Sequence, residues 1–162
     1  NIIENMLEDG IDTFYEIALP WLKKEESLKI YDSKKLLKLI QSRIEILSEI
    51  PEKLKFLPFV APHTTEMYCH KKFKLDENGA KESLIQVKEK YEKLSAWNET
   101  AIHDALIELA QETGKKNGMI MWPARVALCG LDSTPGGAVE LADIIGKEET
   151  LKRLDNAIKM FG

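Results

Sequence analysis

The chain has 162 residues, of which 44% are hydrophobic and 31% charged, and its formal net charge is −4. This length is enough for one core, or two small fused cores, without disulfides or metals to stabilise them. No apolar run approaches the roughly 20 residues that a membrane span needs, so we expect a soluble, cytoplasmic protein with no membrane partner. The two cysteines lack Cys-x-x-Cys spacing, which favours reduced thiols over a disulfide framework.

The distribution of charge is more informative than its sum. Residues 1–22 contain acidic side chains but no Lys or Arg, whereas residues 23–93 carry more Lys and Arg than Asp and Glu. A weakly basic middle segment can attract RNA, although nucleic-acid-binding domains usually have a basic net charge. Solvated helix faces with paired charges would give the same distribution, so charge alone leaves both interpretations open.

Two amphipathic patterns occupy the first third of the chain. Residues 11–22 are predicted to form a helix that Pro20 bends or ends. The next helix is predicted to start at Asp32 or Ser33, either of which can cap it, and to run to Pro51.

Arg43 lies at the margin of the apolar stripe of this second helix. Such a guanidinium either pairs with a carboxylate, here Glu45 or Glu49, or projects into a groove. The local sequence leaves both roles open.

Residues 56–73 lack helical periodicity and are predicted to form a loop with a short helix. This segment contains His63, Cys69 and His70, which are ligand types for zinc. A tetrahedral zinc site needs four ligands in recognisable pairs, and no fourth partner lies nearby, so we expect no metal. Cys69 is instead expected to pack, and the two histidines are expected to face solvent.

Two further helices are predicted at residues 80–94 and 99–113, each with an apolar face. Asn98 is a favourable N-cap for the second of them, and Gly114 is a favourable stop. The lysines of the first helix are interspersed with glutamates, which is typical of a solubilising face.

Glycine and proline divide the remaining chain into three short helices. Pro123 fits the first position of one helix, and Gly130 ends it. Residues 133–137 form a turn, followed by helices predicted at 138–145 and 147–160. No alternating strand pattern is present, so the fold class is predicted to be all-α.

A boundary is predicted near residues 115–118. It divides the chain into two small fused helical subdomains, residues 1–116 and 117–162. The chain begins with Asn and lacks a targeting segment, so it is expected to be an excised fragment or a processed chain.

Several motifs occur in one order along the chain. They are Ala18-Leu-Pro-Trp-Leu22, Arg43, Glu112-Thr-Gly114, Met121-Trp-Pro-Ala-Arg-Val-Ala-Leu-Cys-Gly130, Ser133-Thr-Pro135, Ile145-Gly-Lys147 and Arg153-Leu154. With this order and spacing, essentially the whole chain resembles the C-terminal, anticodon-binding region of bacterial glutamyl-tRNA synthetases. The resemblance implies a helical cage that reads unstacked anticodon bases.

The resemblance also implies roles for individual residues. Arg43 would read one end base of the anticodon, while Arg125, Thr134 and Pro135 would line the pocket for its neighbours. Gly137 would join this site, although it stands where family members often have leucine. Trp97 and Trp122 could stack on bases, but tryptophans in such positions are more often packed inside the protein. Arg153 could form an internal salt bridge with Glu149.

No catalytic motif is present in this chain. It lacks a Gly-rich phosphate loop, a nucleophile with a placed base, and the His-x-Gly-His and Lys-Met-Ser-Lys-Ser motifs of class I synthetases. The resemblance implies that ATP, glutamate and magnesium bind an N-terminal catalytic half of the parent chain. It also implies a monomer that binds tRNA-Glu, and it leaves open whether tRNA-Gln is charged too. The competing hypothesis is a free-standing helical adaptor that binds protein.

Overall fold

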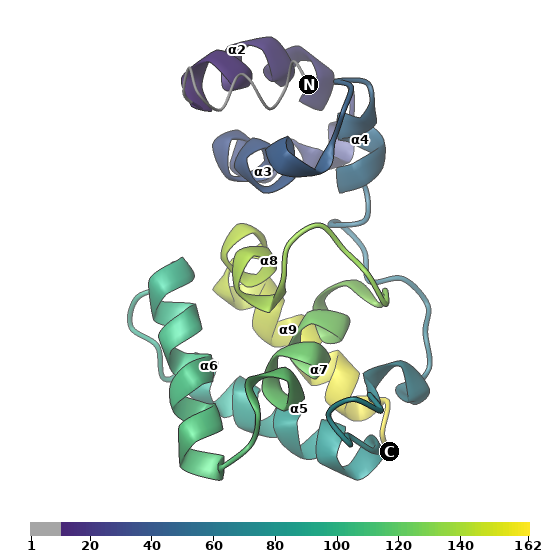
Figure 1. Ribbon diagram of the computed structural model, residues 1–162, viewed down its shortest axis with the longest axis vertical. Coiled ribbons are helices and arrows are strands. Elements are labelled where there is room, and N and C mark those ends of the chain that lie inside the picture. The colour runs from purple at the N-terminus through teal and green to yellow at the C-terminus, as the bar shows by residue number, and fades with distance from the viewer. Residues whose placement is uncertain (1–10) are drawn as a thin grey trace. The chain divides into compact units, whose positions relative to one another are not determined.

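The computed structural model describes residues 11–162, so residues 1–10 of the acidic N-terminal segment lie outside the described part. The elements are α2 (Ile11–Leu22), η1 (Glu26–Leu28), α3 (Ser33–Ile40), η2 (Gln41–Arg43), α4 (Glu49–Leu54), η3 (Thr65–Tyr68), α5 (Glu77–Glu92), α6 (Glu99–Thr113), α7 (Asn117–Cys129), α8 (Ala138–Ile145) and α9 (Lys147–Lys159) (Figure 1). Within these residues the only β feature is an isolated bridge between His70 and Leu75. The predicted all-α class is confirmed.

Contacts between Cα atoms divide the chain into two units, residues 1–59 and 60–162. Helices α2, α3 and α4 pack together in the first unit, and α5 to α9 pack together in the second. The boundary predicted between residues 116 and 117 therefore lies inside the second unit. The reason is that α5 and α6 both pack on α7, so they share its core. Patterns within single helices do not show which helices share a core.

Helix α3 is shorter than predicted. Its N-cap is Asp32, one of the two predicted possibilities, and the Asp32 side chain accepts a hydrogen bond from the Lys35 N–H at 3.2 Å. The helix ends at Ile40 instead of continuing to Pro51, and Ile44 has extended backbone angles of φ −127° and ψ 152°. The apolar side chains on both sides of this break, Ile40 and Ile44, are still buried.

A carboxylate holds the turn that follows this break. Glu49 accepts hydrogen bonds from the backbone N–H groups of Glu45 at 2.8 Å and Ile46 at 3.3 Å. These bonds lower the pKa of Glu49, and they satisfy N–H groups that a continuous helix would otherwise have used. Glu49 also begins α4, and Pro51 lies inside this helix in its first turn, where a proline is tolerated.

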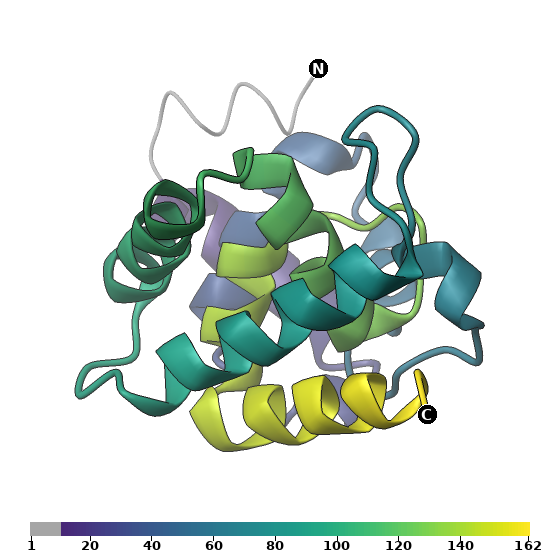
Figure 2. The same ribbon diagram turned by 90° about the horizontal axis from the view of Figure 1, so that it is seen from below.

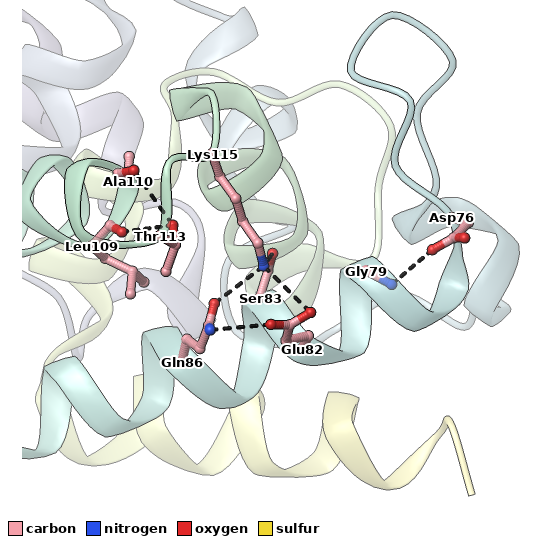
Figure 3. A network of polar contacts seen from close by, with 9 residues as sticks. All are labelled: Asp76, Gly79, Glu82, Ser83, Gln86, Leu109, Ala110, Thr113 and Lys115. Carbon is pink, nitrogen blue, oxygen red and sulfur yellow. Dashed lines mark hydrogen bonds and ion pairs between the residues drawn. The ribbon is translucent and has the colours of Figure 1, made fainter.

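Helix α5 begins earlier than predicted. The Asp76 side chain accepts a hydrogen bond from the Gly79 N–H at 2.8 Å and so caps the helix before Glu77 (Figure 3). The residues Asn78 and Gly79, which punctuate the sequence, are therefore part of the first helical turn. Three residues of the predicted inward face, Leu84, Val87 and Tyr91, are buried, whereas the fourth, Leu94, follows the end of the helix and is half-buried.

Lys115 connects the end of α6 to α5. Helix α6 has the predicted caps: Asn98 accepts from the Ala101 N–H at 2.8 Å, and Gly114 adopts a left-handed conformation with φ 71°. After this turn, the Lys115 ammonium reaches Gln86 Oε1 at 3.2 Å and also contacts Ser83 Oγ at 3.4 Å and Glu82 Oε2 at 3.8 Å (Figure 3). The first residue after the turn thus joins two helices of the second unit.

Ion pairs connect α5 with its two neighbours. Lys88 lies 3.0 Å from Asp155 on α9, which runs beside α5 (Figure 2), and Lys90 lies 3.0 Å from Glu112 on α6. The lysines of α5 are therefore more than a solubilising face.

In the described part of the chain, no helix is long and apolar enough to cross a bilayer.

Asp155→Asn is expected to make the stability of the second unit less sensitive to acid. Hydrogen bonds from Lys159 and Lys88 lower the pKa of Asp155 below its ordinary value, so its contribution is present above about pH 4 and is lost as pH falls through the folded-state pKa. The variant should be slightly less stable than the parent at neutral pH and equal to it in acid. Urea unfolding at several pH values measures this, and a difference that persists at the lowest pH would contradict it.

Candidate nucleic-acid interface

Helix α7 carries the most distinctive motif of the sequence, and it begins earlier than predicted. It starts at Asn117, so Pro123 lies inside the helix instead of at its first position. A proline inside a helix removes one backbone hydrogen bond. Burial of Pro123 and of its neighbours Ile120 and Ala124 offsets this loss, since tertiary packing routinely overrides local preference.

The C-terminal end of α7 is tightly enclosed. Gly130 ends the helix in a left-handed conformation with φ 69°, as its position predicts. The Cys129 carbonyl accepts a hydrogen bond from the Ala61 N–H at 2.9 Å. A Cβ atom added at Gly130 would lie 2.3 Å from the Ala61 carbonyl oxygen. Only glycine therefore fits where the 60–63 segment crosses this helix end.

Arg125 points from α7 into the turn formed by residues 131–136, which we name the 131–136 turn. Its Nη1 donates to the Leu131 carbonyl at 3.1 Å and to Thr134 Oγ1 at 3.1 Å, and its Nη2 donates to the Asp132 carbonyl at 2.8 Å. The residue is only 9% exposed. A buried charge is stable when hydrogen bonds surround it, and here backbone carbonyls supply most of them.

The 131–136 turn is further ordered by its own residues. Thr134 accepts from Arg125 and donates its hydroxyl hydrogen to the Gly136 carbonyl at 3.1 Å. Gly136 has φ 75°, a conformation that favours glycine. The next residue, Gly137, donates its N–H to the Glu140 carboxylate at 2.9 Å at the start of α8. This bond is one of the two in a capping box. The other cannot form, because Gly137 has no side chain to accept it.

Both tryptophans singled out in the sequence are half-buried, and each makes a hydrogen bond and a ring contact within the second unit. The Trp122 indole N–H donates to the Met67 carbonyl at 3.0 Å, and its ring lies 4.8 Å from the Arg125 guanidinium carbon. The Trp97 indole N–H donates to the Ala142 carbonyl at 2.9 Å. The packing interpretation is confirmed for both.

A second buried arginine reaches the same end of α7. Arg153, on α9, is 4% exposed and donates to the Leu128 carbonyl at 2.8 Å. Its predicted salt bridge with Glu149 is present at 3.1 Å. Two guanidinium groups therefore face the negative end of the α7 dipole, Arg153 at Leu128 and Arg125 just beyond the helix.

Arg43 lies in the first unit, at the end of η2. Its side chain is exposed, and its Nη1 donates to the Leu39 carbonyl at 2.5 Å. Glu49, a predicted partner, holds backbone N–H groups instead. The structure thus brings Arg125 and Thr134 into contact and places Pro135 and Gly137 beside them in sequence, whereas Arg43 belongs to a separate unit.

An open hollow of about 570 Å³ lies where the first turns of α6 and α8 meet. Its lining includes Gly137, Glu99, His103 and Glu140. The two carboxylates disfavour a phosphate group in this hollow. No sequence pattern marks it, because it forms between helices that are distant in the chain.

The two histidines of the 56–73 segment, His63 and His70, are half-buried and contact neighbouring rings instead of facing solvent. His63 contacts the Ala61 carbonyl and the Tyr68 hydroxyl, both at 2.7 Å, while burial raises the pKa of Tyr68 and so keeps it protonated. Burial also raises the pKa of two thiols, that of Cys69 in this segment and that of Cys129 on α7. The described residues contain no group of three or more His, Cys, Asp or Glu side chains that could hold a metal ion.

Comparisons with known proteins place the chain in a family. The family model of the anticodon binding domain matches residues 13–158. A glutamate–tRNA ligase of Clostridium kluyveri is 42% identical over 156 residues, which are 96% of this chain and 32% of that protein, and one of Clostridium tetani is 40% identical over 150 residues, which are 93% and 30%. The chain therefore spans about a third of the length of these relatives.

The fold agrees with this match. The solved structure of a glutamate tRNA ligase from Elizabethkingia meningosepticum superposes with a TM-score of 0.68 at 20% identity, over 99% of this chain and 31% of that one. The structure of a glutamate-tRNA synthetase from Elizabethkingia anophelis superposes with a TM-score of 0.66 at 24% identity, over 90% of this chain and 28% of that one. At these identities the likeness concerns the fold alone. Because the family model covers most of the chain, the chain belongs to the anticodon-binding domain family.

Proposed function

We propose that this chain is the part of a glutamate–tRNA ligase that recognises the anticodon of tRNA-Glu. The observation that carries this proposal is the match of the anticodon binding domain to residues 13–158. Relatives that are about 40% identical over almost the whole chain are glutamate–tRNA ligases, which supports the choice of amino acid and tRNA.

Arg43 is the residue that we propose to read an anticodon base directly. Its guanidinium is exposed, and it donates to the backbone carbonyl of Leu39, a contact that does not neutralise its charge. A planar guanidinium can donate two hydrogen bonds to one base edge, and such a pair discriminates against the wrong base by about 1–3 kcal/mol. Thr134, Pro135 and Gly137 are proposed to line the site for neighbouring bases, with the contact at Gly137 limited by its missing side chain.

The aminoacylation chemistry is proposed to belong to the part of the full-length protein that this chain does not cover. That part would bind ATP, magnesium and glutamate, and the complete enzyme would act as a cytoplasmic monomer. The relatives' greater length supports this division. Neither the structure nor the comparisons support the adaptor hypothesis.

The test is titration of the chain with tRNA-Glu and with a copy changed at one anticodon base. Binding is expected to favour tRNA-Glu and to weaken as salt rises, because phosphate contacts release counterions. Arg43→Ala should reduce the preference about tenfold at one anticodon position, in line with the loss of one bidentate contact. Lys53→Ala, which removes another exposed cation of the first unit, should weaken binding to both RNAs alike.

Three outcomes would contradict the proposal. Equal affinity of the parent chain for both RNAs would exclude anticodon recognition. An Arg43→Ala variant that lowers only the thermal stability would give Arg43 a structural role through its bond to Leu39. Retention of a protein partner without RNA would favour an adaptor instead.

A further inference from the structure

We propose that residues 70–75, which we name the 70–75 hairpin, form a second RNA contact that binds phosphate groups beside the anticodon. This inference rests on the proposed function and deepens it, because it assigns part of the affinity to a surface that reads no base. The partner is identified by its charge. The closely spaced phosphates of an RNA backbone attract closely spaced cations, which release counterions when they bind.

The 70–75 hairpin carries a dense group of cations. It leads into Asp76 at the start of α5 and stands out from the helices (Figure 3). It contains three exposed lysines, Lys71, Lys72 and Lys74, and no acidic residue. Within the described part of the chain none of the three forms an ion pair, whereas Lys88 of α5 pairs with a carboxylate. The charges of the hairpin are therefore available to an anionic ligand.

The backbone of the hairpin is held in a defined shape. The His70 N–H donates to the Leu75 carbonyl and the Leu75 N–H donates to the His70 carbonyl, both at 3.0 Å. The Lys74 N–H donates to the Lys71 carbonyl at 3.1 Å and closes the turn. Lys74 has φ 52°, a left-handed value that no other described non-glycine residue adopts. The sequence thus places a cation where glycine would suit the backbone better, which favours a role for its charge.

Two aromatic rings anchor the hairpin to α7. Phe73 packs against Gly118 so closely that a Cβ atom added at Gly118 would lie 2.1 Å from the ring. The His70 ring lies 4.6 Å from the Phe73 ring and 4.6 Å from the Trp122 ring. The lysines between these anchors are therefore presented by a pre-formed loop, and little chain has to be ordered when a ligand binds.

The same contacts place the hairpin next to the candidate site. The Trp122 ring touches His70 on the hairpin and also lies 4.8 Å from the Arg125 guanidinium carbon. Arg125 in turn donates three hydrogen bonds to the 131–136 turn. One tryptophan thus separates the hairpin from the residues around the proposed base site. A nucleotide at the 131–136 turn would have its neighbouring phosphates within reach of the hairpin.

Two carboxylates lie close to the lysines and limit where a phosphate can bind. Glu66 and Asp76 line a hollow of about 310 Å³ together with Lys71 and Lys74. The mixed charge of this hollow does not suit a phosphate. The Asp76 carboxylate is bound to the Gly79 N–H at 2.8 Å. The phosphates are therefore expected outside the hollow, on the exposed surface of the hairpin.

The experiment measures binding of whole tRNA-Glu and of its anticodon stem–loop at several salt concentrations. The triple variant Lys71→Gln/Lys72→Gln/Lys74→Gln is compared with the parent chain. Each phosphate contact contributes about 0.7–0.9 to the slope of log Kd against log salt, so this slope should fall by about two units with both RNAs. Affinity at about 0.1 M salt should fall at least about tenfold. The preference for the correct anticodon should stay the same, because phosphate contacts carry no sequence information.

Two controls separate a local charge effect from its alternatives. Lys93→Gln/Lys152→Gln removes two other exposed lysines of the second unit that form no ion pair within the described residues, and it should leave the slope unchanged. Replacing Lys71, Lys72 and Lys74 by arginine keeps the three cations and should keep the parent slope. Thermal unfolding of the glutamine variant should match that of the parent chain, since the anchoring contacts of the hairpin remain.

Three results would overturn the proposal. The first is an unchanged salt slope in the glutamine variant. The second is a slope that falls with whole tRNA-Glu but not with the stem–loop, because the contact would then lie away from the anticodon. The third is an arginine variant that behaves like the glutamine variant, since the effect would then come from the shape of the loop.

The hairpin contact and anticodon recognition can fail separately. A parent chain without preference for the correct anticodon, combined with a reduced slope in the glutamine variant, would remove anticodon recognition and leave the phosphate contact. A retained preference with an unchanged slope would do the reverse. A parent chain that binds neither RNA at low salt would remove both.

Discussion

Gly130→Ala is expected to destabilise the second unit by about 3 kcal/mol, of which the left-handed φ of 69° accounts for about 1 kcal/mol or more in a non-glycine residue. The new Cβ would also lie 2.3 Å from the Ala61 carbonyl oxygen and 2.7 Å from His63 Nδ1. A backbone oxygen cannot turn away as a side chain can, so the 60–63 segment must shift and strain its bond to Cys129. Urea unfolding followed by circular dichroism measures this loss.

Gly114→Ala is the matched control for this prediction. Gly114 also ends a helix in the left-handed conformation, with φ 71°, but a Cβ atom added there would have no heavy atom of another part of the chain within 4 Å. This variant should be destabilised only by the cost of the left-handed conformation in a non-glycine residue, which is about 1 kcal/mol. An equal decrease in the free energy of unfolding of the two variants would show that the close approach of Ala61 does not contribute to the effect of Gly130→Ala.

Arg153→Met is expected to destabilise the second unit by about 2–3 kcal/mol, because it removes the donor to the buried Leu128 carbonyl, which lies at 2.8 Å. The substitution keeps much of the side chain's apolar volume. A buried acceptor left without a partner costs about 1–3 kcal/mol, and bonds from charged donors lie at the upper end of the range. Thermal and urea unfolding measure the change.

Glu149→Gln separates the carbonyl contact from the ion pair. The Glu149 side chain is 45% exposed, so its pairing with Arg153 is screened by solvent and should contribute little. We expect a loss below about 1 kcal/mol. A loss as large as that of Arg153→Met would assign the stabilisation to the ion pair instead of the helix end.

Local signals in the sequence were sufficient for several helix ends. Helix α6 begins after Asn98 and ends before Gly114, as predicted, because an N-cap side chain and a left-handed glycine act within one turn of chain. Prolines were less informative. Pro51 lies in the first turn of α4, where its missing N–H removes no helical hydrogen bond, and Pro123 lies inside α7, where burial offsets the bond that is lost.

The sequence proposed the residues of the candidate site, but it did not indicate how they contact one another. Residue type and family resemblance pointed to Arg125 and Thr134, and the structure joins them by a hydrogen bond at 3.1 Å. Two further acceptors of Arg125, on Leu131 and Asp132, are carbonyls, which every residue carries and no sequence pattern marks. The Arg153–Glu149 pair was predictable because its members are four residues apart on one helix.

The residues around the 131–136 turn fall into two groups: some hold its backbone from inside the protein, and others are accessible on its surface. Arg125 and Gly130 sustain the backbone from within, whereas Ser133 faces outward and Pro135 is partly accessible. Under the proposed function, substitutions at the outer positions would change the surface offered to RNA and leave the buried contacts of the turn in place. Directed evolution toward a new anticodon would then start at these positions.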